Sequence, residues 1–161
     1  MSGRINWGRV AVVAIGLACL GAAGGIWYTQ NYAYYEELAP ETVSLTVVVA
    51  GAEVPLAARV TRAIDAGSAP HRWRACGTID QPLPEGATPY PAAAPTHGPG
   101  WFDCFLAEVI GRDLLSGAAT AYLSQGDIHH GIDRVIAVYP DGRVFGWHQI
   151  TDALNERGVM D

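Results

Sequence analysis

Two cysteines in the C-terminal part of the chain are the first candidates for chemistry. A proline-rich stretch separates Cys76 from Cys104, and the third cysteine, Cys19, lies within a run of apolar residues. Outside the cytoplasm such a pair most often forms a disulfide, which for a loop of this length adds roughly 3–4 kcal/mol to stability. The alternative is a thiol-dependent enzyme, in which Cys104 would react with the help of a histidine. Because no Cys-x-x-Cys motif supports redox chemistry, we predict a Cys76–Cys104 disulfide.

Three histidines near the C-terminus are the second set of candidates. His129 and His130 are neighbours in an expected turn, and His148 follows on an expected hairpin. Imidazole is a common ligand of zinc and copper, but the chain has neither a His-x-x-x-His pair on a helix nor a cluster of methionines. We therefore predict no metal and no cofactor, and keep these three histidines as the ligands of an alternative, metal-binding function.

Composition excludes several other classes of function. The net charge is −6 and every basic side chain is arginine, so Schiff-base lysines and nucleotide-binding P-loops are absent. The acidic balance argues against nucleic acid as a partner and against a surface built to lie on anionic lipid. No Gly-x-Ser-x-Gly motif indicates a serine hydrolase. We expect no catalytic residues and no enzymatic activity.

The element that must position everything else is the apolar run at residues 10–28. It contains no charge and no proline, and its length suits a helix that crosses a bilayer. Arg4 and Arg9 precede it and acidic residues follow it, so residues 1–9 are expected in the cytoplasm and the rest of the chain outside. The prediction is a single-pass anchor in a bacterial inner membrane, with the C-terminal domain in the periplasm.

A retained anchor competes with two alternatives. A cleaved signal peptide is disfavoured because residues 26–28 continue the apolar run past the small residues at 22–25. A lipoprotein signal ending at Cys19 is disfavoured because Gly16 stands where a large aliphatic residue is expected.

Two side-chain patterns within the anchor suggest contacts. Aromatic residues at both ends are placed to lie at the membrane interfaces: Trp7, Trp27, Tyr28 and Tyr32. Small residues recur on one face and would allow another membrane helix to approach closely: Ala14, Ala18, Gly21, Ala22 and Gly25. Alternatively, these small residues have no role in helix contacts, because alanine and glycine are common in membrane spans.

The remainder is expected to be an aromatic and acidic juxtamembrane link at residues 29–41 and one α+β domain at residues 42–161. The domain should contain an antiparallel sheet and one or two helices, because strand and helix patterns alternate without a regular βαβ rhythm. Strands are predicted at residues 42–49, 53–57, 72–79 and 118–124, with a hairpin around Pro140-Asp141-Gly142.

The sequence also predicts helices, a turn and a long loop in this domain. Residues 61–66 are expected to form a helical turn, and Asp103 to cap a helix that ends at Gly117. A turn is predicted at residues 126–131 and a last helix at 151–161. The proline-rich residues 81–100 should form an irregular loop, either a functional one or a solvated excursion pinned at both ends.

Three segments of the chain resemble sequences of a known family. They are YAYYEE at residues 32–37, WFDCF at 101–105 and GIDRVIAVYPDGRVFGWHQI at 131–150. Together they resemble a family of uncharacterised, single-pass, membrane-anchored proteins of alphaproteobacteria, across residues 32–150. The resemblance implies an inner-membrane location. It implies no activity, because the family has none that is established.

The favoured hypothesis is a non-enzymatic accessory or assembly protein of the inner membrane. Its partners would be other inner-membrane proteins, bound through the anchor and through the periplasmic domain or its 81–100 loop. The alternative is a periplasmic ligand- or metal-binding sensor domain on a membrane anchor.

Overall fold

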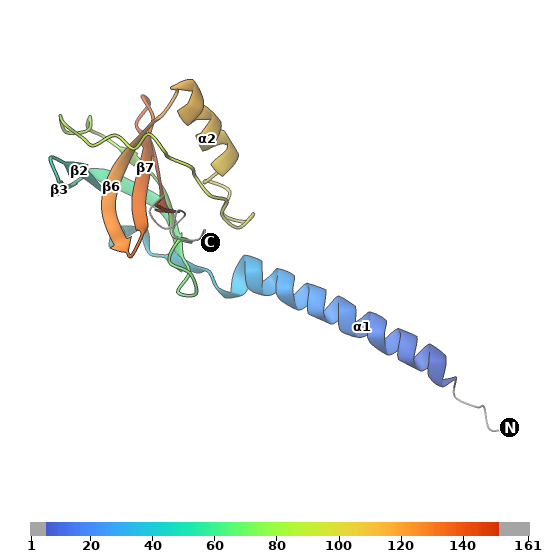
Figure 1. Cartoon of the computed structure of the whole chain (residues 1–161). Helices are drawn as coiled ribbons and strands as arrows, with labels where there is room; N and C mark the ends of the chain where they lie inside the picture. The colour runs from blue at the N-terminus through green and yellow to red at the C-terminus, as the bar shows by residue number, and fades with distance from the viewer. Residues whose placement is uncertain (1–5, 152–161) are drawn as a thin grey trace, which may run out of the picture. The chain divides into compact units, whose positions relative to one another are not determined.

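The computed structural model describes residues 6–151 and has the α+β fold that the sequence predicts. The chain forms two compact units that meet in sequence between Tyr34 and Tyr35. The first unit contains helix α1, and the second contains an antiparallel sheet with one further helix (Figure 1). The last predicted helix, at residues 151–161, lies almost wholly outside the described residues.

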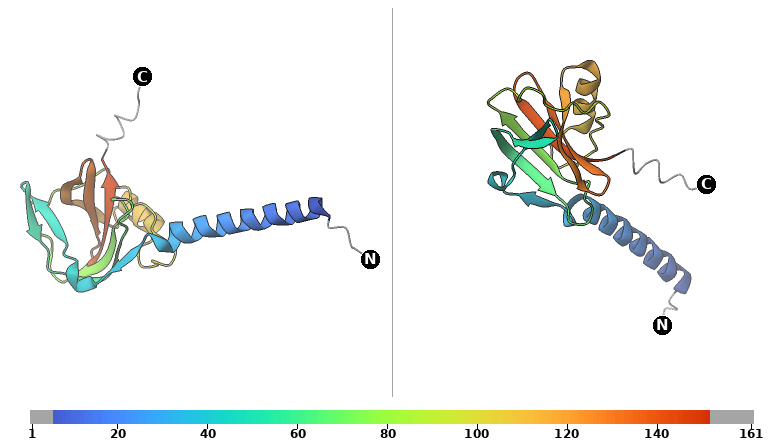
Figure 2. Two further views of the ribbon diagram at one scale, coloured as in Figure 1. Left: turned by 90° about the horizontal axis from the view of Figure 1, so that it is seen from below. Right: turned by 60° about the vertical axis from the view of Figure 1, so that its left-hand side comes forward.

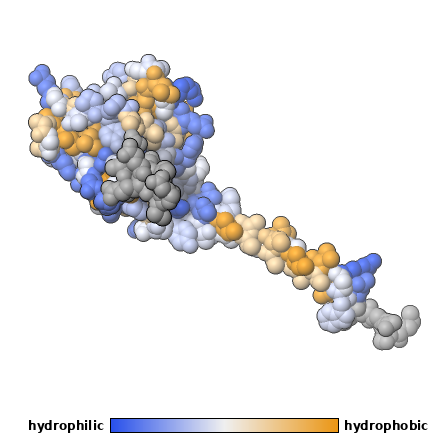
Figure 3. All heavy atoms as spheres, viewed as in Figure 1, coloured by the Kyte–Doolittle hydropathy of each residue, from blue (hydrophilic) through white to orange (hydrophobic). Residues whose placement is uncertain are grey.

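Helix α1 spans Trp7–Tyr28 and continues as a π-helical turn at Thr29–Ala33. It begins three residues before the predicted apolar run, because the Asn6 side chain caps its first turn by accepting a hydrogen bond from the Arg9 amide at 3.3 Å. None of its residues is buried, and apolar side chains cover most of its length (Figure 3).

The second unit is built on a six-stranded antiparallel sheet with the strand order β1-β4-β5-β8-β7-β6. In chain order these strands are β1 Glu36–Leu38, β4 Ala58–Asp65, β5 Arg74–Ile79, β6 Thr120–His129, β7 Ile132–Val138 and β8 Arg143–Ile150. A 3₁₀ turn at Pro40–Thr42 precedes a separate hairpin, made of β2 Thr46–Val49 and β3 Ala52–Pro55. Helix α2 spans Ala107–Ser116.

Both faces of the sheet are covered, so the domain has two cores (Figure 2). Helix α2 and the segment before it pack on one face, where Trp147 and Val135 are fully buried. Leu45, just before β2, and Val47, within β2, pack on the other face in one cluster with Ile136. The central strands therefore bury side chains on both sides.

This double burial explains why the helical turn predicted at residues 61–66 is wrong. Residues 61–65 belong to β4, where Ala63 faces one core and Ile64 the other. A strand buried on both faces lacks the alternation of apolar and polar residues by which strands are recognised. An irregularity between Val60 and Arg62 further disturbs the pattern.

Two other local predictions are also wrong. Residues 126–129 belong to β6, and only His130 and Gly131 form the turn. Turn-type residues such as Gly126 and Asp127 occur in this strand because it is irregular, with two register shifts and a positive φ at Asp127 (48°). Asp103 does not cap α2, since Leu106 occupies the N-cap position without a side-chain hydrogen bond. The end of α2 at Gly117, with φ of 77°, is as predicted.

The predicted hairpin is confirmed, with β7 and β8 paired from Ile132–Ile150 to Val138–Val144. Two connecting segments differ from expectation. Glu36–Leu38, expected within the juxtamembrane link, forms the edge strand β1 beside β4. Residues 81–100 contain no helix or strand but are attached to the domain along their length, so they are not a solvated excursion held only at its ends.

Three sets of contacts attach this proline-rich segment. Tyr90 and Thr88 exchange main-chain hydrogen bonds with β6, which covers that edge of the sheet. The Gln149 side chain binds the main chain of Ala92 and Ala94, at 2.7 Å each. Arg74 then binds Thr96 near the segment's end.

Candidate functional site

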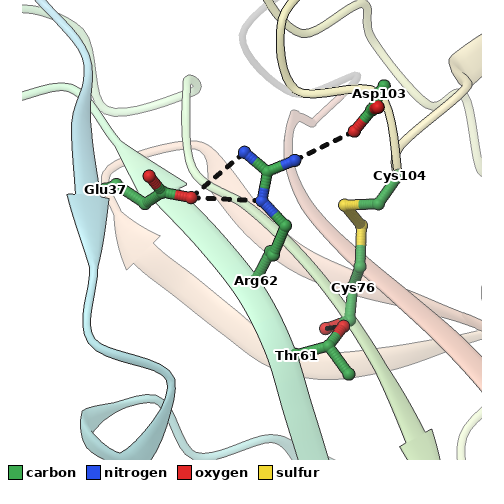
Figure 4. The surroundings of a disulfide bond; sticks show 6 residues. All are labelled: Glu37, Thr61, Arg62, Cys76, Asp103 and Cys104. Atoms are coloured by element: carbon green, nitrogen blue, oxygen red, sulfur yellow. Dashed lines mark hydrogen bonds and ion pairs between the residues drawn. A yellow bond between two sulfur atoms is a disulfide. The ribbon is translucent and has the colours of Figure 1, made fainter.

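The two cysteines singled out by the sequence lie together in the second unit. The sulfur atoms of Cys76, on β5, and Cys104, in the segment before α2, are 2.13 Å apart, at bonding distance (Figure 4). The Cys76 carbonyl also accepts a hydrogen bond from the Thr61 hydroxyl at 3.0 Å. A sulfur held in this bond is not a thiol nucleophile, so Cys104 offers no site for thiol-dependent catalysis while the bond exists.

A guanidinium beside the disulfide joins two segments that are far apart in sequence. Arg62 binds Asp103 through Nη1 at 2.9 Å and Glu37 of β1 through Nε and Nη2 at 3.1 Å each (Figure 4). Its guanidinium also lies 5.0 Å from the centre of the Phe102 ring. Both carboxylates are largely exposed, so solvent screening keeps the energy of each pair small.

The three histidines proposed as metal ligands have different environments. His129 and His130 are exposed, whereas His148 is only 4% exposed. Within residues 6–151 no three histidine, cysteine or carboxylate side chains are grouped so that they could hold a metal ion.

His148 is held in a stack that the sequence did not indicate. Its Nδ1–H donates to the Pro70 carbonyl at 2.6 Å, and its Nε2 accepts from the Arg134 Nε at 3.0 Å. The ring stacks on Trp73 at 5.0 Å, and the Arg134 guanidinium lies 4.3 Å from that indole ring. Burial lowers the pKa of His148 to about 4, so the imidazole is neutral at pH 7 and acts as a hydrogen-bond acceptor for Arg134.

Arg74 is a second buried group that sequence reasoning missed. It is 2% exposed, and burial lowers the pKa of its guanidinium to about 10. All five of its N–H groups have acceptors, contributed by His71, Trp73, Thr96 and His97. Those acceptors are carbonyl oxygens and one hydroxyl, so the arginine fixes the main chain and carries no visible catalytic role.

Two shallow grooves flank α2. One, of about 310 Å³, lies between the proline-rich segment and the end of the helix, lined by Pro89, Pro91, Leu114 and Leu115 among others. Leu115 is 92% exposed. The other, of about 400 Å³, lies at the beginning of the helix, and its lining combines apolar residues such as Phe102, Phe105 and Leu106 with the ionisable side chains of His97, Asp103 and Glu108.

The predicted helix-contact and interface residues all lie on α1 and the π-helical turn that follows it. A side chain added at Gly21 or Gly25 would meet nothing within 4 Å. Tyr32 contacts both Trp27 and Tyr28, with ring centres 5.5 Å and 5.9 Å apart. Within residues 6–151 the structure has one helix, Trp7–Ala33, that is long and apolar enough to cross a membrane.

Residues 43–157 match the family of unknown function DUF6446. The chain belongs to this family. No curated protein and no solved structure matches it. The DUF6446 match includes both cysteines, the proline-rich segment and the Trp73–Arg134–His148 stack, but it begins after the apolar helix. The matched residues thus cover most of the folded domain and leave out both the helix and the edge strand β1.

Proposed function

We propose that this chain is a non-enzymatic accessory or assembly protein of a bacterial inner membrane, with a single anchor and a periplasmic interaction domain. The observation that carries the proposal is helix α1, which is apolar over most of its surface and has no buried residue. Exposing so much apolar surface to water is unfavourable, whereas a bilayer removes that cost.

The direction of insertion rests on charge and on the cysteines. Arg4 and Arg9 precede the apolar run and no arginine follows it until Arg59, so the N-terminus remains in the cytoplasm. The domain then enters the periplasm, where a Cys76–Cys104 disulfide persists. This topology agrees with the inner-membrane location that the resemblance to alphaproteobacterial anchored proteins implies.

The interaction role rests on how the domain's polar side chains are used. His148, Arg74 and Asp133 hold parts of the fold together through hydrogen bonds, which leaves them poorly placed to act on a substrate. A large apolar side chain is meanwhile exposed at Leu115, beside the groove formed with the proline-rich segment. A single exposed leucine is common on protein surfaces, but here it continues the apolar lining of the groove, and a contiguous apolar surface is typical of protein–protein contacts.

The test is to extract the full-length chain gently from membranes by a C-terminal tag and identify the accompanying proteins by mass spectrometry. We expect an inner-membrane protein at fixed stoichiometry. A chain that washes off the membrane would contradict the anchor, and a chain that is anchored but always purified alone would contradict the accessory role.

Paired variants locate the contact. Gly21→Ile with Gly25→Ile should weaken the association through the helix, while Gly16→Ile, on another face, serves as the control. Leu115→Gln should weaken an association through the domain without lowering stability, because the side chain is already exposed. A complex that survives all three substitutions at the proposed surfaces would show that its contacts lie elsewhere.

A further inference from the structure

The first residue of the second unit belongs to a cluster of three side chains from distant parts of the chain. The Tyr35 ring meets Trp101 edge-on, with ring centres 6.2 Å apart. The guanidinium of Arg72 lies 5.5 Å from the centre of the Tyr35 ring. We call Tyr35, Arg72 and Trp101 the Tyr35 cluster.

Arg72 carries a charge that no carboxylate of the described chain neutralises. Arg59, Arg62 and Arg143 each form ion pairs, but none of the ion pairs within residues 6–151 includes Arg72. Its Nη1 is shielded from solvent and has no hydrogen-bond partner there. The aromatic face of Tyr35 compensates only part of this cost. A half-buried cation of this kind favours an anionic ligand from outside the chain.

The position of Tyr35 along the chain suggests where that anion comes from. Tyr35 follows Ala33, the last residue of the helical segment, by two residues, a distance of at most about 7 Å. If the helix spans the membrane, Tyr35 lies at or near the level of the lipid headgroups. Tyrosine and tryptophan prefer that level, and a guanidinium binds phosphate strongly.

We propose that the Tyr35 cluster binds the phosphate of a membrane phospholipid, with Arg72 supplying the positive charge and Trp101 lying at the interface. This inference rests on the proposed anchoring of the chain. The Tyr35 ring, 5.5 Å from the guanidinium, and the Trp101 ring against it favour a lipid over free phosphate, because they offer aromatic surface beside the cation.

The acidic balance of the chain restricts the type of lipid. A net charge of −6 disfavours a broad contact with anionic lipid, but a single arginine needs only one phosphate. A zwitterionic phospholipid provides that phosphate without adding net negative charge. We therefore expect binding to zwitterionic bilayers, with no requirement for anionic lipid.

Tryptophan fluorescence can test this in the full-length chain. With Trp7→Phe and Trp27→Phe, the remaining indoles are Trp101 and two buried residues, Trp73 and Trp147. In vesicles of phosphatidylcholine brominated near the glycerol end of its acyl chains, we expect quenching relative to unbrominated vesicles. Adding Trp101→Phe should abolish the quenching.

Arginine variants test the role of the charge. Arg72→Gln should lose most of the quenching, whereas Arg72→Lys should retain it and Arg59→Gln, at the far end of β4, should leave it unchanged. Near-ultraviolet circular dichroism verifies that each variant is folded. Quenching equal to the parent's in a folded Arg72→Gln protein would overturn the phosphate contact.

A matched variant separates this inference from the anchoring on which it rests. With Trp7→Phe and Trp101→Phe, the quenchable indole is Trp27 of α1. Absence of Trp27 quenching would contradict the anchor itself. Quenching of Trp27 together with unquenched Trp101 would leave the anchor in place and overturn the lipid site, pointing instead to a protein carboxylate as the partner of Arg72.

Discussion

Arg74 and Thr96 are joined twice, since the guanidinium of Arg74 donates to both the carbonyl oxygen and the hydroxyl of Thr96. The carbonyl bond measures 3.0 Å. Arg74 begins β5, and Thr96 lies near the end of the proline-rich segment. Because a proline-rich segment can offer few main-chain donors of its own, a side chain rich in donors is an effective way to fix it to the sheet.

Replacing Arg74 should therefore destabilise the domain strongly. Arg74→Met keeps much of the side-chain volume but leaves the acceptors of His71, Trp73 and Thr96 without their donor. Several hydrogen bonds from a charged group are lost, so we expect a decrease of about 3 kcal/mol or more in the free energy of unfolding.

Urea unfolding of the full-length chain in detergent, followed by near-ultraviolet circular dichroism, measures this decrease. Arg59→Met is the control, because Arg59 is 77% exposed and should change stability by about 0.5 kcal/mol or less. Equal midpoints for the two variants would mean that Arg74 does not hold the proline-rich segment.

The fold could be predicted where the local signal and the three-dimensional environment agree. The β7–β8 hairpin has apolar strands on either side of Pro140-Asp141-Gly142, and the end of α2 has a glycine at the position that needs positive φ. Strand β4 could not be recognised, because burial on both faces removed its alternation.

The candidate functional residues were also predictable only in part. The Cys76–Cys104 pair follows from residue type and compartment alone, without knowledge of the fold. The partners of Arg74 and His148 could not be foreseen, because they are carbonyl oxygens of loops, and no pattern of side chains marks them. His148 therefore stood out in the sequence as a metal ligand, while in the fold it accepts a hydrogen bond from Arg134.

His148 should make stability depend on pH. Its pKa is about 4 in the folded chain against an ordinary value of 6.5, so the unfolded chain binds a proton that the folded chain does not. The contribution is fully present above pH 6.5 and is lost as the pH falls toward 4. The loss amounts to about 3 kcal/mol at most.

Unfolding in urea at a series of pH values tests this, with His148→Gln compared with the parent chain. The difference between the two chains should shrink as the pH falls from 6.5 to 4, because the variant lacks the titrating group. His130→Gln, at an exposed position, should follow the parent throughout. A difference that stays constant over this range would show that His148 titrates normally.

Reducing the Cys76–Cys104 bond should lower stability by about 3–4 kcal/mol, the chain-entropy value for a separation of 28 residues. A phosphine reductant should therefore shift the urea midpoint of the parent chain downward. The double variant Cys76→Ala/Cys104→Ala should unfold at that lower midpoint, and the reductant should not shift its midpoint further. Cys19→Ala should behave as the parent does, since Cys19 is a free cysteine.

Gly146 on β8 allows the Trp73 indole to approach the main chain closely. A Cβ at this position would lie 2.8 Å from the indole Cζ3 and 2.9 Å from Cη2, closer than any ordinary contact. In Gly146→Ala the indole must move, and with it the ring surface on which His148 and Arg134 stack. We expect a loss of about 1–3 kcal/mol, the usual cost of overpacking a core.

The control for this substitution is Gly67→Ala, where an added Cβ meets nothing within 4 Å. Its unfolding midpoint should stay close to the parent's. The pKa of His148, followed by the imidazole proton resonances, should rise toward 6.5 in Gly146→Ala, because displacement of Trp73 exposes the ring to water. If stability fell while that pKa stayed near 4, the cost would come from β8 alone and the indole would not be what keeps His148 buried.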